Sequence, residues 1–425
     1  MKAVVLAAGE GVRLQPITLT RPKHLIKVGG KPILEHCLDA LSDSGIEEVL
    51  IVVHYMADKI RDYFGDGIEF GLKIDYVEQK AMLGTGDAVG IVESHMNETF
   101  LMVYGDLLFS AEAVKKVITL HDGEKPAATM AVVPVENPEN YGIVRLENEK
   151  YVKSLIEKPT REEAATSLAN AGIYVFSPEI FQKVKETSAS GRGEWEITDA
   201  VSLLMKEKTV LAVQISKEDW MDIGRPWDLL EANKWALTRS EHRVLGSVET
   251  GVHIIGPVTV AETARIRSGA YIEGPALIDE ESDVGPNCYI RAGTSIGRNV
   301  RVGNACEIKN SIIMDGTHVG HLSYVGDSIL GENCNLGAGT VTANYRLDEG
   351  TVKMNIKDTV VDSGRTKLGA ILGDGVKAGI NALFMPGVKV GTGSWIGPNV
   401  VVNRDVPSGI VVLLKQEVEE KKLGP

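Results

Sequence analysis

The first 25 residues combine glycines and basic residues in a way that fits polyphosphate binding. Gly9 and Gly11 follow a short apolar run and lack a Cβ, so the backbone there can approach phosphate oxygens and direct N–H groups at them. Arg13 offers a planar fork suited to pyrophosphate, and Lys23 offers a compact positive charge. The spacing is not that of a P-loop, and the third glycine of the dinucleotide fingerprint is missing. The loop therefore predicts a site for one nucleoside triphosphate.

A second group of polar side chains has the types needed for acyl transfer to an amine. It comprises Arg291, Lys309, His321, Tyr324, Asn335 and Asn344. A histidine can take the proton of an ammonium group near neutral pH, and the freed amine can then attack a thioester. Arg291 and Lys309 can hold a phosphate, while the Asn and Tyr side chains can orient sugar hydroxyls. For His321 taken alone, a purely structural histidine is the alternative.

The elements that would position the first group alternate between β-branched runs and helical patterns. Strands are expected at 3–6, 48–53, 73–78, 100–104, 128–134, 143–146 and 172–176, and helices at 32–44 and 57–64. This alternation predicts a Rossmann-like α/β fold with a mostly parallel sheet buried on both faces. Ligands of such sheets bind beyond the carboxyl ends of the strands, where the glycine-rich loop would lie.

After residue 250 the helical patterns vanish and a six-residue period appears. Aliphatic residues fill ten consecutive slots from Ile254 to Ile308, and the period returns from Leu372 to Val402 after two shifts in phase. Such hexapeptide repeats predict a left-handed parallel β-helix whose aliphatic residues point into a continuous core. Residues 342–365 are expected to leave the coils as a longer, functional excursion.

These patterns predict a domain organisation. A chain of 425 residues is too long for one hydrophobic core. We expect a first domain at 1–240, a helical linker at about 226–250, a β-helix domain at 251–410 and a charged tail at 411–425.

Composition excludes several classes of partner. The net charge of -13 disfavours a nucleic acid, and no apolar run has membrane-spanning or leader-peptide character. The widely spaced Cys37, Cys288, Cys306 and Cys334 are interpreted as buried free thiols of a cytoplasmic protein.

Residues 1–240 resemble the sugar-1-phosphate nucleotidylyltransferase family. The resemblance rests on the run LAAGEGVRLQPITLTRPKHL, followed in order by LGTG, YGD, YGIV, EKP, NAG, EITD and WMDIG. One departure is Val12, where the family commonly has Thr. The resemblance implies transfer of a nucleotidyl group to a sugar 1-phosphate with release of pyrophosphate. Such a reaction is catalysed by in-line positioning and charge neutralisation.

The resemblance also implies roles for single residues. Arg13 would stabilise the leaving pyrophosphate and Lys23 the α-phosphate, while Asp106 and Asp222 would bind Mg²⁺. Lys158 would hold the sugar phosphate. The nucleotide would contact Leu6, Ala8, Gly9, Gly11, Gln79, Gly84, Thr85 and Asp106, and the sugar would contact Gly142, Glu157, Lys158 and Asn170.

Structural interpretations stay open for some neighbouring residues. Asp222 precedes Ile-Gly and is alternatively the cap of a turn. Glu196 and Asp199 are alternatively the first-turn acids of a helix. His24 is expected to serve packing rather than chemistry.

The residues from Arg291 to Asn344 resemble, in type and spacing, the acetyltransferase half of bacterial bifunctional enzymes that make UDP-N-acetylglucosamine. The whole chain resembles archaeal bifunctional sugar-1-phosphate nucleotidylyltransferase/acetyltransferases. This resemblance implies that His321 is the catalytic base. It implies that acetyl-CoA lies between subunits of a homotrimer, or a multiple of it, against Ala338, Gly379, Ile380 and Gly397. Gly350 stands where the bacterial pattern has a lysine, and Lys353 is the candidate replacement for the sugar-phosphate contact.

The leading hypothesis is a bifunctional enzyme. It would N-acetylate glucosamine 1-phosphate, or galactosamine 1-phosphate, with acetyl-CoA. It would also transfer a uridylyl group from UTP, or use dTTP, onto N-acetylglucosamine 1-phosphate or glucose 1-phosphate. The alternative is a monofunctional nucleotidylyltransferase whose β-helix serves only assembly or regulation, as in ADP-glucose or GDP-mannose pyrophosphorylases. A third hypothesis, a non-catalytic protein resembling translation exchange-factor subunits, is disfavoured by Arg13, Lys23, Asp106 and Lys158.

Overall fold

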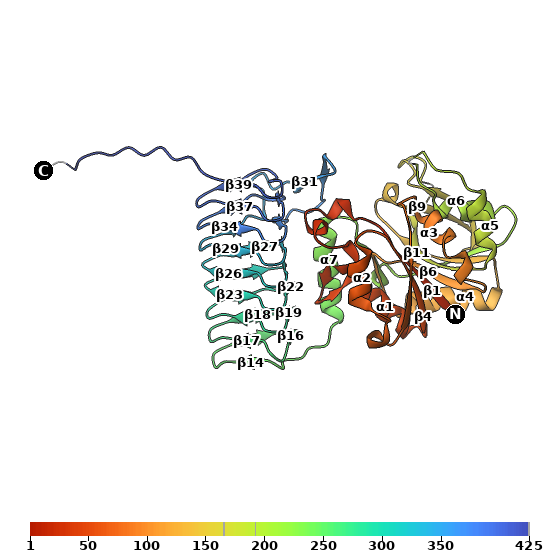
Figure 1. Cartoon of the computed structure of the whole chain (residues 1–425), viewed down its shortest axis with the longest axis horizontal. Helices are drawn as coiled ribbons and strands as arrows, with labels where there is room; N and C mark the ends of the chain where they lie inside the picture. The colour runs from red at the N-terminus through yellow and green to blue at the C-terminus, as the bar shows by residue number, and fades with distance from the viewer. Residues whose placement is uncertain (165, 192, 424–425) are drawn as a thin grey trace. The chain divides into compact units, whose positions relative to one another are not determined.

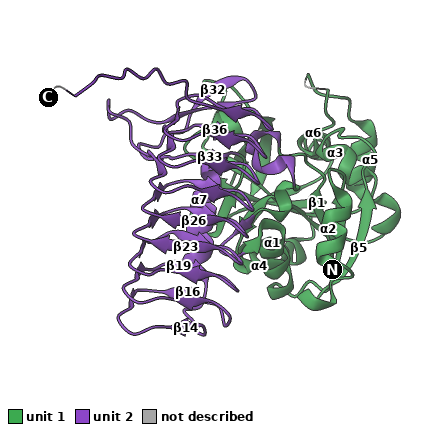
Figure 2. Cartoon of the chain, turned by 60° about the vertical axis from the view of Figure 1, so that its left-hand side comes forward, with its two compact units in different colours: residues 1–11, 21–26, 31–224 green, residues 12–20, 27–30, 225–425 purple. Residues whose placement is uncertain are grey.

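The computed structural model describes residues 1–164, 166–191 and 193–423, so residues 424–425 of the predicted tail lie outside the described chain. It divides into two compact units, drawn in different colours in Figure 2. The first unit comprises residues 1–11, 21–26 and 31–224, and the second comprises residues 12–20, 27–30 and 225–425.

The first unit is built on a nine-stranded sheet of order β5-β4-β1-β6-β11-β8-β12-β10-β9. Its strands are β1 (Lys2–Ala7), β4 (Glu48–Val53), β5 (Lys73–Glu78), β6 (Phe100–Tyr104), β8 (Ala128–Pro134), β9 (Gly142–Glu147), β10 (Tyr151–Glu157), β11 (Leu168–Phe176) and β12 (Val210–Gln214). Pairing is parallel among β5, β4, β1 and β6 and between β8 and β12. Strand β11 runs antiparallel to β6 and β8, so the sheet is mixed beyond β6.

Helices cover both faces of this sheet, as the apolar character of its strands predicts. The helices are α1 (Ile33–Asp43), α2 (Ala57–Phe64), α3 (Thr85–Gly90), α4 (Ala111–Glu124), α5 (Glu179–Glu186) and α6 (Ile197–Leu204). In β1, Ala3 and Val5 pack with α1, α2 and α4 on one face, and Val4 and Leu6 pack with α3, α5 and α6 on the other. The α/β fold expected from the alternating pattern is confirmed.

The second unit contains three parallel sheets whose short strands stack coil upon coil (Figure 1). The first sheet holds β14 (Ser247–Val248), β17 (Arg265–Ile266), β20 (Asp283–Val284), β23 (Arg301–Asn304), β26 (His318–His321), β29 (Asn335–Leu336), β34 (Lys377–Ala378), β37 (Trp395–Ile396) and β39 (Val411–Val412). The second holds β15 (His253–Ile255), β18 (Tyr271–Glu273), β21 (Tyr289–Ile290), β24 (Glu307–Lys309), β27 (Tyr324–Gly326), β30 (Val341–Thr342), β35 (Leu383–Phe384) and β38 (Val401–Val402). The third holds β16 (Val258–Val260), β19 (Ala276–Ile278), β22 (Thr294–Ile296), β25 (Ile312–Ile313), β28 (Ile329–Leu330), β33 (Ile371–Leu372) and β36 (Lys389–Val390). This arrangement confirms the predicted parallel β-helix.

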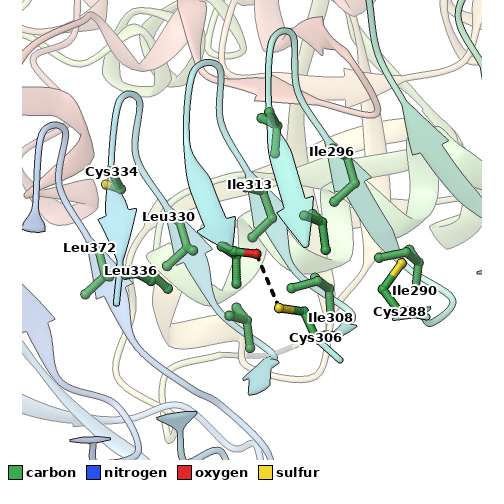
Figure 3. Close-up of a cluster of buried hydrophobic side chains, with 14 of the residues drawn as sticks. Cys288, Ile290, Ile296, Cys306, Ile308, Ile313, Leu330, Cys334, Leu336 and Leu372 are labelled. Carbon is green, nitrogen blue, oxygen red and sulfur yellow. Dashed lines mark hydrogen bonds between the residues drawn. The ribbon is translucent and has the colours of Figure 1, made fainter. Parts of the chain in front are cut away.

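The aliphatic residues of the six-residue period form the core of this β-helix. Figure 3 shows Ile290, Ile308, Ile313 and Leu330 packed together, and all four are buried. The shifts in phase have a simple cause, which is a change of coil length. Ile278 pairs with Ile296, 18 residues on, whereas Ile296 pairs with Ile313 after 17 residues. A coil shortened by one residue keeps every core side chain pointing inward.

Two segments depart from the regular coils. The chain leaves the stack after β30 and forms an antiparallel hairpin of β31 (Lys353–Ile356) and β32 (Thr359–Asp362), which confirms the predicted excursion. Helix α7 (Pro226–Arg239) packs within the second unit, where the buried Asn233 donates to the carbonyl of Gly293 at 2.9 Å and accepts from Ser295 at 2.6 Å.

The four cysteines are buried free thiols, as predicted. Figure 3 includes Cys288, Cys306 and Cys334 among the core side chains of the β-helix. None of the described helices is both long and apolar enough to cross a membrane.

Candidate functional sites

The glycine-rich loop begins at the carboxyl end of β1, in the middle of the parallel strands of the first unit. Lys23 returns to this point, because a Cβ on Gly9 would lie 3.3 Å from both Cε and Nζ of Lys23. A Cβ at this position would be a tight contact for the Lys23 side chain, which glycine avoids. The same ammonium donates to the carboxylate of Asp106, which follows β6 next to β1. The structure thus brings Gly9, Lys23 and Asp106 together at one edge of the sheet.

The Lys23–Asp106 pair defines the charge of this edge. Burial alone would raise the pKa of Asp106, but the Lys23 ammonium lowers it below its usual value through its charge and its hydrogen bond. Asp106 is therefore ionised at neutral pH. Asp222 lies nearby along the backbone, since β13 (Trp220–Asp222) pairs with β7 (Leu107–Phe109) and Asp222 stands opposite Leu107.

His24 follows Lys23 and is buried, with no hydrogen-bond partner for either ring nitrogen in the described chain. Burial, reinforced by the charge of Lys23, lowers its pKa to about 3. The imidazole is therefore neutral at physiological pH, as expected of a packing residue.

Three of the predicted nucleotide-binding residues, Gln79, Gly84 and Thr85, lie in a second loop at the same edge. Gln79 follows β5 and is buried, with its amide donating to the Gly84 carbonyl at 3.2 Å and to Asp87 at 2.7 Å. Gly84 has a φ of 107°, and a Cβ there would lie 2.4 Å from the Trp195 carbonyl, so this position requires glycine. Thr85 accepts a hydrogen bond from the Ile197 N–H at 3.0 Å. The turn holding Gly84 and Thr85 is thereby fixed to the start of α6.

The two acids near this turn differ in placement. Glu196 precedes α6 and is buried, and its carboxylate accepts from the Thr85 hydroxyl at 3.5 Å. Asp199 lies in the first turn of α6, the position expected of a helix-starting acid.

The predicted sugar-binding residues lie on β9, β10 and β11. Gly142 pairs with Glu157, and a Cβ on Gly142 would lie 2.8 Å from the Glu157 carboxylate. Lys158 follows β10 with a φ of 45°, and its Nζ lies 3.8 Å from Glu157. Asn170 on β11 accepts from the Gly172 N–H at 3.0 Å. These four residues come from neighbouring strands of one sheet.

The remaining loop residues are placed by the backbone. The Leu6 carbonyl accepts from the Gly105 N–H at 2.9 Å, and the Ala8 carbonyl accepts from Tyr55 at 3.5 Å. Gly11 has a φ of 70°. Arg13 is exposed in the short 3-10 helix η1 (Val12–Leu14), which belongs to the second unit.

A hollow of about 620 Å³ in the first unit lies elsewhere. It is lined by Lys2, Glu48, Phe100 and their neighbours, at the amino ends of β1, β4 and β6. None of the predicted site residues lines it.

In the second unit, the predicted phosphate-binding residues follow successive strands of one sheet. The Arg291 N–H donates to the Ile308 carbonyl, which puts Arg291 beside Lys309 on the next coil. Lys309 in turn pairs with Gly326. Neighbouring strands in a sheet are about 4.8 Å apart, so these side chains lie within reach of one small anion. The Arg291 guanidinium donates to Glu307 at 3.0 Å.

Asp327, which the sequence analysis did not single out, joins this group. Its carboxylate accepts from Lys309 Nζ at 2.7 Å and from the Asn344 amide. The Asn344 amide also donates to the Tyr324 hydroxyl at 3.1 Å. Burial raises the pKa of Tyr324, which stays protonated at neutral pH. The signal in the sequence was the coil length, because Asn310, Asp327 and Asn344 follow one another at 17-residue intervals.

His321 is the last residue of β26, which belongs to the first sheet of the β-helix, whereas Lys309 and Tyr324 lie on the second sheet. His321 therefore lies at the corner between these two sheets, and it is exposed. Asn335 pairs with His318 on the adjacent coil. Within the described chain the His321 ring makes no hydrogen bond or ion pair.

The residues predicted to contact acetyl-CoA stack on the coils beyond His321. The Gly339 N–H donates to the His321 carbonyl, and the Asn381 N–H donates to the Ala338 carbonyl. The Gly379 N–H donates to the Ile396 carbonyl, which puts Gly379 and the exposed Ile380 beside Gly397. Ala338, Gly379, Ile380 and Gly397 therefore belong to the same corner as His321.

Lys353 is the predicted residue that stands apart. It lies on β31 of the hairpin, where it pairs with Asp362 and is exposed. Among the described residues it makes no hydrogen bond with the group around Asp327.

Comparison with known proteins decides the family. Residues 2–239 match the family described as Nucleotidyl transferase, and residues 272–380 match the GMPPB C-terminal domain. The chain is 44% identical over 423 residues to the "Bifunctional protein GlmU" of Methanocaldococcus jannaschii, with all of both chains covered. The chain belongs to the nucleotidyl transferase family, and over its full length to the bifunctional GlmU family.

Two further matches extend this comparison. The "Bifunctional sugar-1-phosphate nucleotidylyltransferase/acetyltransferase" of Sulfurisphaera tokodaii is 42% identical, with 96% of this chain and 99% of the relative covered. Among solved structures, a putative glucose-1-phosphate thymidylyltransferase from Bacillus anthracis is 31% identical with a TM-score of 0.52. It covers 56% of this chain and 95% of its own, so the likeness includes only part of this bifunctional family member.

Proposed function

We propose that the chain carries out two successive transfers on one sugar phosphate. It transfers the acetyl group of acetyl-CoA to the amine of glucosamine 1-phosphate, and then a uridylyl group from UTP to the N-acetylglucosamine 1-phosphate so formed. The observation that carries the proposal is the coexistence of two assembled polar groups in one chain. Lys23 lies against Gly9 and Asp106 in the first unit, while Lys309 and Asn344 meet at Asp327 in the second.

In the uridylyl transfer, a phosphate oxygen of the sugar phosphate attacks the α-phosphorus of UTP and pyrophosphate leaves. No covalent enzyme intermediate is needed, so the protein supplies positioning and positive charge. Lys23 would neutralise the α-phosphate and Arg13 the departing pyrophosphate. Lys158 would hold the incoming sugar phosphate, while Glu157 and Asn170 would accept and donate hydrogen bonds at its hydroxyls.

The residues at this edge fit a Mg²⁺ ion. Magnesium in proteins is commonly held by one or two carboxylates, with substrate phosphates and water completing its shell. Asp106 is ionised and Asp222 stands opposite Leu107, the residue after Asp106. When bound, the ion would neutralise phosphate charge as a Lewis acid. No three His, Cys, Asp or Glu side chains gather as a metal cage in the described parts of the chain.

In the acetyl transfer, the sugar amine attacks the thioester carbonyl carbon and the C–S bond breaks. His321 would take the proton from the amine and return it to the departing thiolate. Arg291 and Lys309 would hold the sugar phosphate, with Tyr324, Asn335 and Asn344 at the sugar. Acetyl-CoA would lie along the corner of Ala338, Gly379, Ile380 and Gly397. Lys353, on its hairpin, is the candidate for a further contact with the sugar phosphate.

We further propose that the protein is a homotrimer, or a multiple of one, assembled through the β-helix. Large apolar side chains face outward on its last coils, with Trp395 51%, Val401 51% and Val411 54% exposed. Contiguous exposed apolar surface marks an interaction site, and most oligomers are symmetric assemblies of identical chains. Light scattering should give about three times the 45.9 kDa chain mass, or a multiple of it.

A substrate panel tests the proposal and the monofunctional alternative together. Pyrophosphate release is followed with UTP, dTTP, ATP and GTP against several sugar 1-phosphates, and thiol release from acetyl-CoA against glucosamine and galactosamine 1-phosphates. We expect the fastest pyrophosphate release with UTP and N-acetylglucosamine 1-phosphate, and thiol release with glucosamine 1-phosphate. Pyrophosphate release without thiol release from either amino sugar would establish the monofunctional alternative.

A further inference from the structure

Asp327 is a buried carboxylate at a position whose backbone conformation does not require an acidic side chain. It has a φ of 48°, a left-handed conformation that favours Gly or Asn. The same corner is occupied by Asn310 on the preceding coil and by Gly369 on the following one, as the Asp327 carbonyl accepts from the Gly369 N–H at 2.8 Å. Asn310, with a φ of 45°, adopts the same left-handed conformation without a charge.

The carboxylate is instead surrounded by donors. Lys309 Nζ donates to Oδ2 at 2.7 Å, the Asn344 amide donates to the same oxygen, and the Asn310 amide donates to Oδ1 at 2.7 Å. Its side chain is only 4% exposed, against 17% for Lys309. Charge-assisted hydrogen bonds in a poorly solvated place are strong and fix the geometry of the donors.

Two of these donors, Lys309 and Asn344, are proposed to bind the substrate. A third proposed ligand, Tyr324, is connected to Asp327 through Asn344. The Asn344 amide bridges from Asp327 to the Tyr324 hydroxyl. Lys309, Asn344 and Tyr324 come from different coils, so the coil length sets the spacing of their backbones but does not fix the orientation of their side chains. The carboxylate of Asp327, which accepts hydrogen bonds from both Lys309 and Asn344, fixes these two side chains relative to each other.

We propose that Asp327 is a positioning residue for the acetyl transfer, which holds Lys309 and Asn344, and Tyr324 through Asn344, in the geometry that receives the amino-sugar phosphate. This inference rests on the proposed acetyltransferase function. Asp327 does not touch the reacting atoms. It orients the groups that do, as outer partners of metal ligands and catalytic groups commonly do.

Asp327→Asn is the decisive variant, because Asn tolerates the left-handed backbone and changes only the charge and one acceptor. The Asn oxygen can replace only one of the two carboxylate oxygens. In the place of Oδ2 it leaves the new NH₂ group facing the Asn310 amide, and in the place of Oδ1 it leaves that group facing both Lys309 and Asn344. In either case the negative charge that holds Lys309 is lost. We expect the KM for glucosamine 1-phosphate in thiol release to rise about tenfold or more. The KM for acetyl-CoA and the rate of pyrophosphate release should stay unchanged.

Asp283→Asn is the matched control. Asp283 also pairs with two cations of the β-helix, Arg267 and Arg301, but on a different sheet. It should leave both activities unchanged. Asp327→Gly, which suits the left-handed backbone at this position, keeps the fold testable if the Asn variant unfolds, and should raise the same KM.

A double-mutant cycle separates positioning from a purely structural role. If Asp327 acts through Lys309, Lys309→Ala should raise the KM for the sugar phosphate less in the Asp327→Asn background than in the wild type. Fully multiplicative effects, an unchanged KM, or a lowered KM caused by removing a competing anion would each overturn the inference. Absence of thiol release by the wild-type protein would instead overturn the proposed function on which it rests.

Discussion

The two groups of polar residues are assembled by opposite means. In the first unit, Gly9, Gln79 and Asp106 follow three different strands, and only the sheet order β5-β4-β1-β6 brings them together. In the β-helix, Arg291, Lys309 and Asp327 lie at the ends of stacked strands at intervals of 18 residues, so proximity is a direct result of coil length. A solenoid converts spacing in sequence into distance in space, whereas an α/β sheet requires its topology to be known.

The comparison is tested most strongly at Lys23. Lys23→Ala removes the ammonium beside Gly9 and leaves Asp106 without its partner. We expect kcat/KM for pyrophosphate release to fall about 10³-fold, the upper range for loss of one preorganised electrostatic group. Acetyl-CoA thiol release should be unaffected.

Lys153→Ala is the control for this variant, since Lys153 forms an exposed pair with Glu147 at 3.5 Å on the same unit. It should retain both activities. Loss of thiol release in Lys23→Ala would contradict the separation of the two sites.

The corresponding test in the β-helix is His321→Ala. We expect thiol release to fall about 10²-fold or more, the lower range for general acid–base catalysis, while pyrophosphate release persists. His318→Ala is the matched control, because His318 is an exposed histidine on the same strand. Undiminished acetylation in His321→Ala would show that another group accepts the proton.

The sequence predicted the fold well where a repeating physical pattern exists. The bounds of β4, β5, β6 and α2 agree with the expected segments, and every six-residue core position from Val260 to Val402 that we expected to be inward is buried. What the patterns could not supply is the antiparallel course of β11, because a strand buried on both faces reads the same in either direction.

The candidate sites were predicted unevenly for a related reason. Single residues such as Asp106 and Lys158 came from resemblance, because nothing in local spacing indicates which loops of a sheet meet. Asp327 was within reach of the 17-residue coil length but was missed, since an Asp after Gly at a strand end is also a common turn residue. Nothing in the sequence around Thr85 or Ile197 predicts the hydrogen bond from the Ile197 N–H to the Thr85 hydroxyl.

Truncations of core residues test the same contrast between the sheet and the β-helix, and we expect their effects to be smaller than those of the site variants. Ile51 and Ile308 are both fully buried, in β4 and β24. Truncation of either to Ala should cost about 2–5 kcal/mol of unfolding free energy. We expect Ile308→Ala to speed hydrogen exchange mainly in the adjoining coils of Ile290 and Val325, because each coil contacts only its neighbours. Ile51→Ala should speed exchange across the nine-stranded sheet, and equal spread in both variants would contradict the contrast.

The smallest expected effect concerns the thiols, which the two units bury equally. Burial raises the pKa of Cys37 in the first unit and raises the pKa of Cys288 and of Cys334 in the β-helix to about 12. A raised pKa means that the reactive thiolate is scarce at every pH well below 12, and that it grows only as the pH approaches that value. At pH 8 a thiol reagent should therefore label none of the four cysteines in the folded protein and all four after denaturation. The same reagent can then report thiol release from acetyl-CoA without background. Labelling of a β-helix cysteine but not of Cys37 at pH 8 would show that the stacked coils open more readily than the sheet.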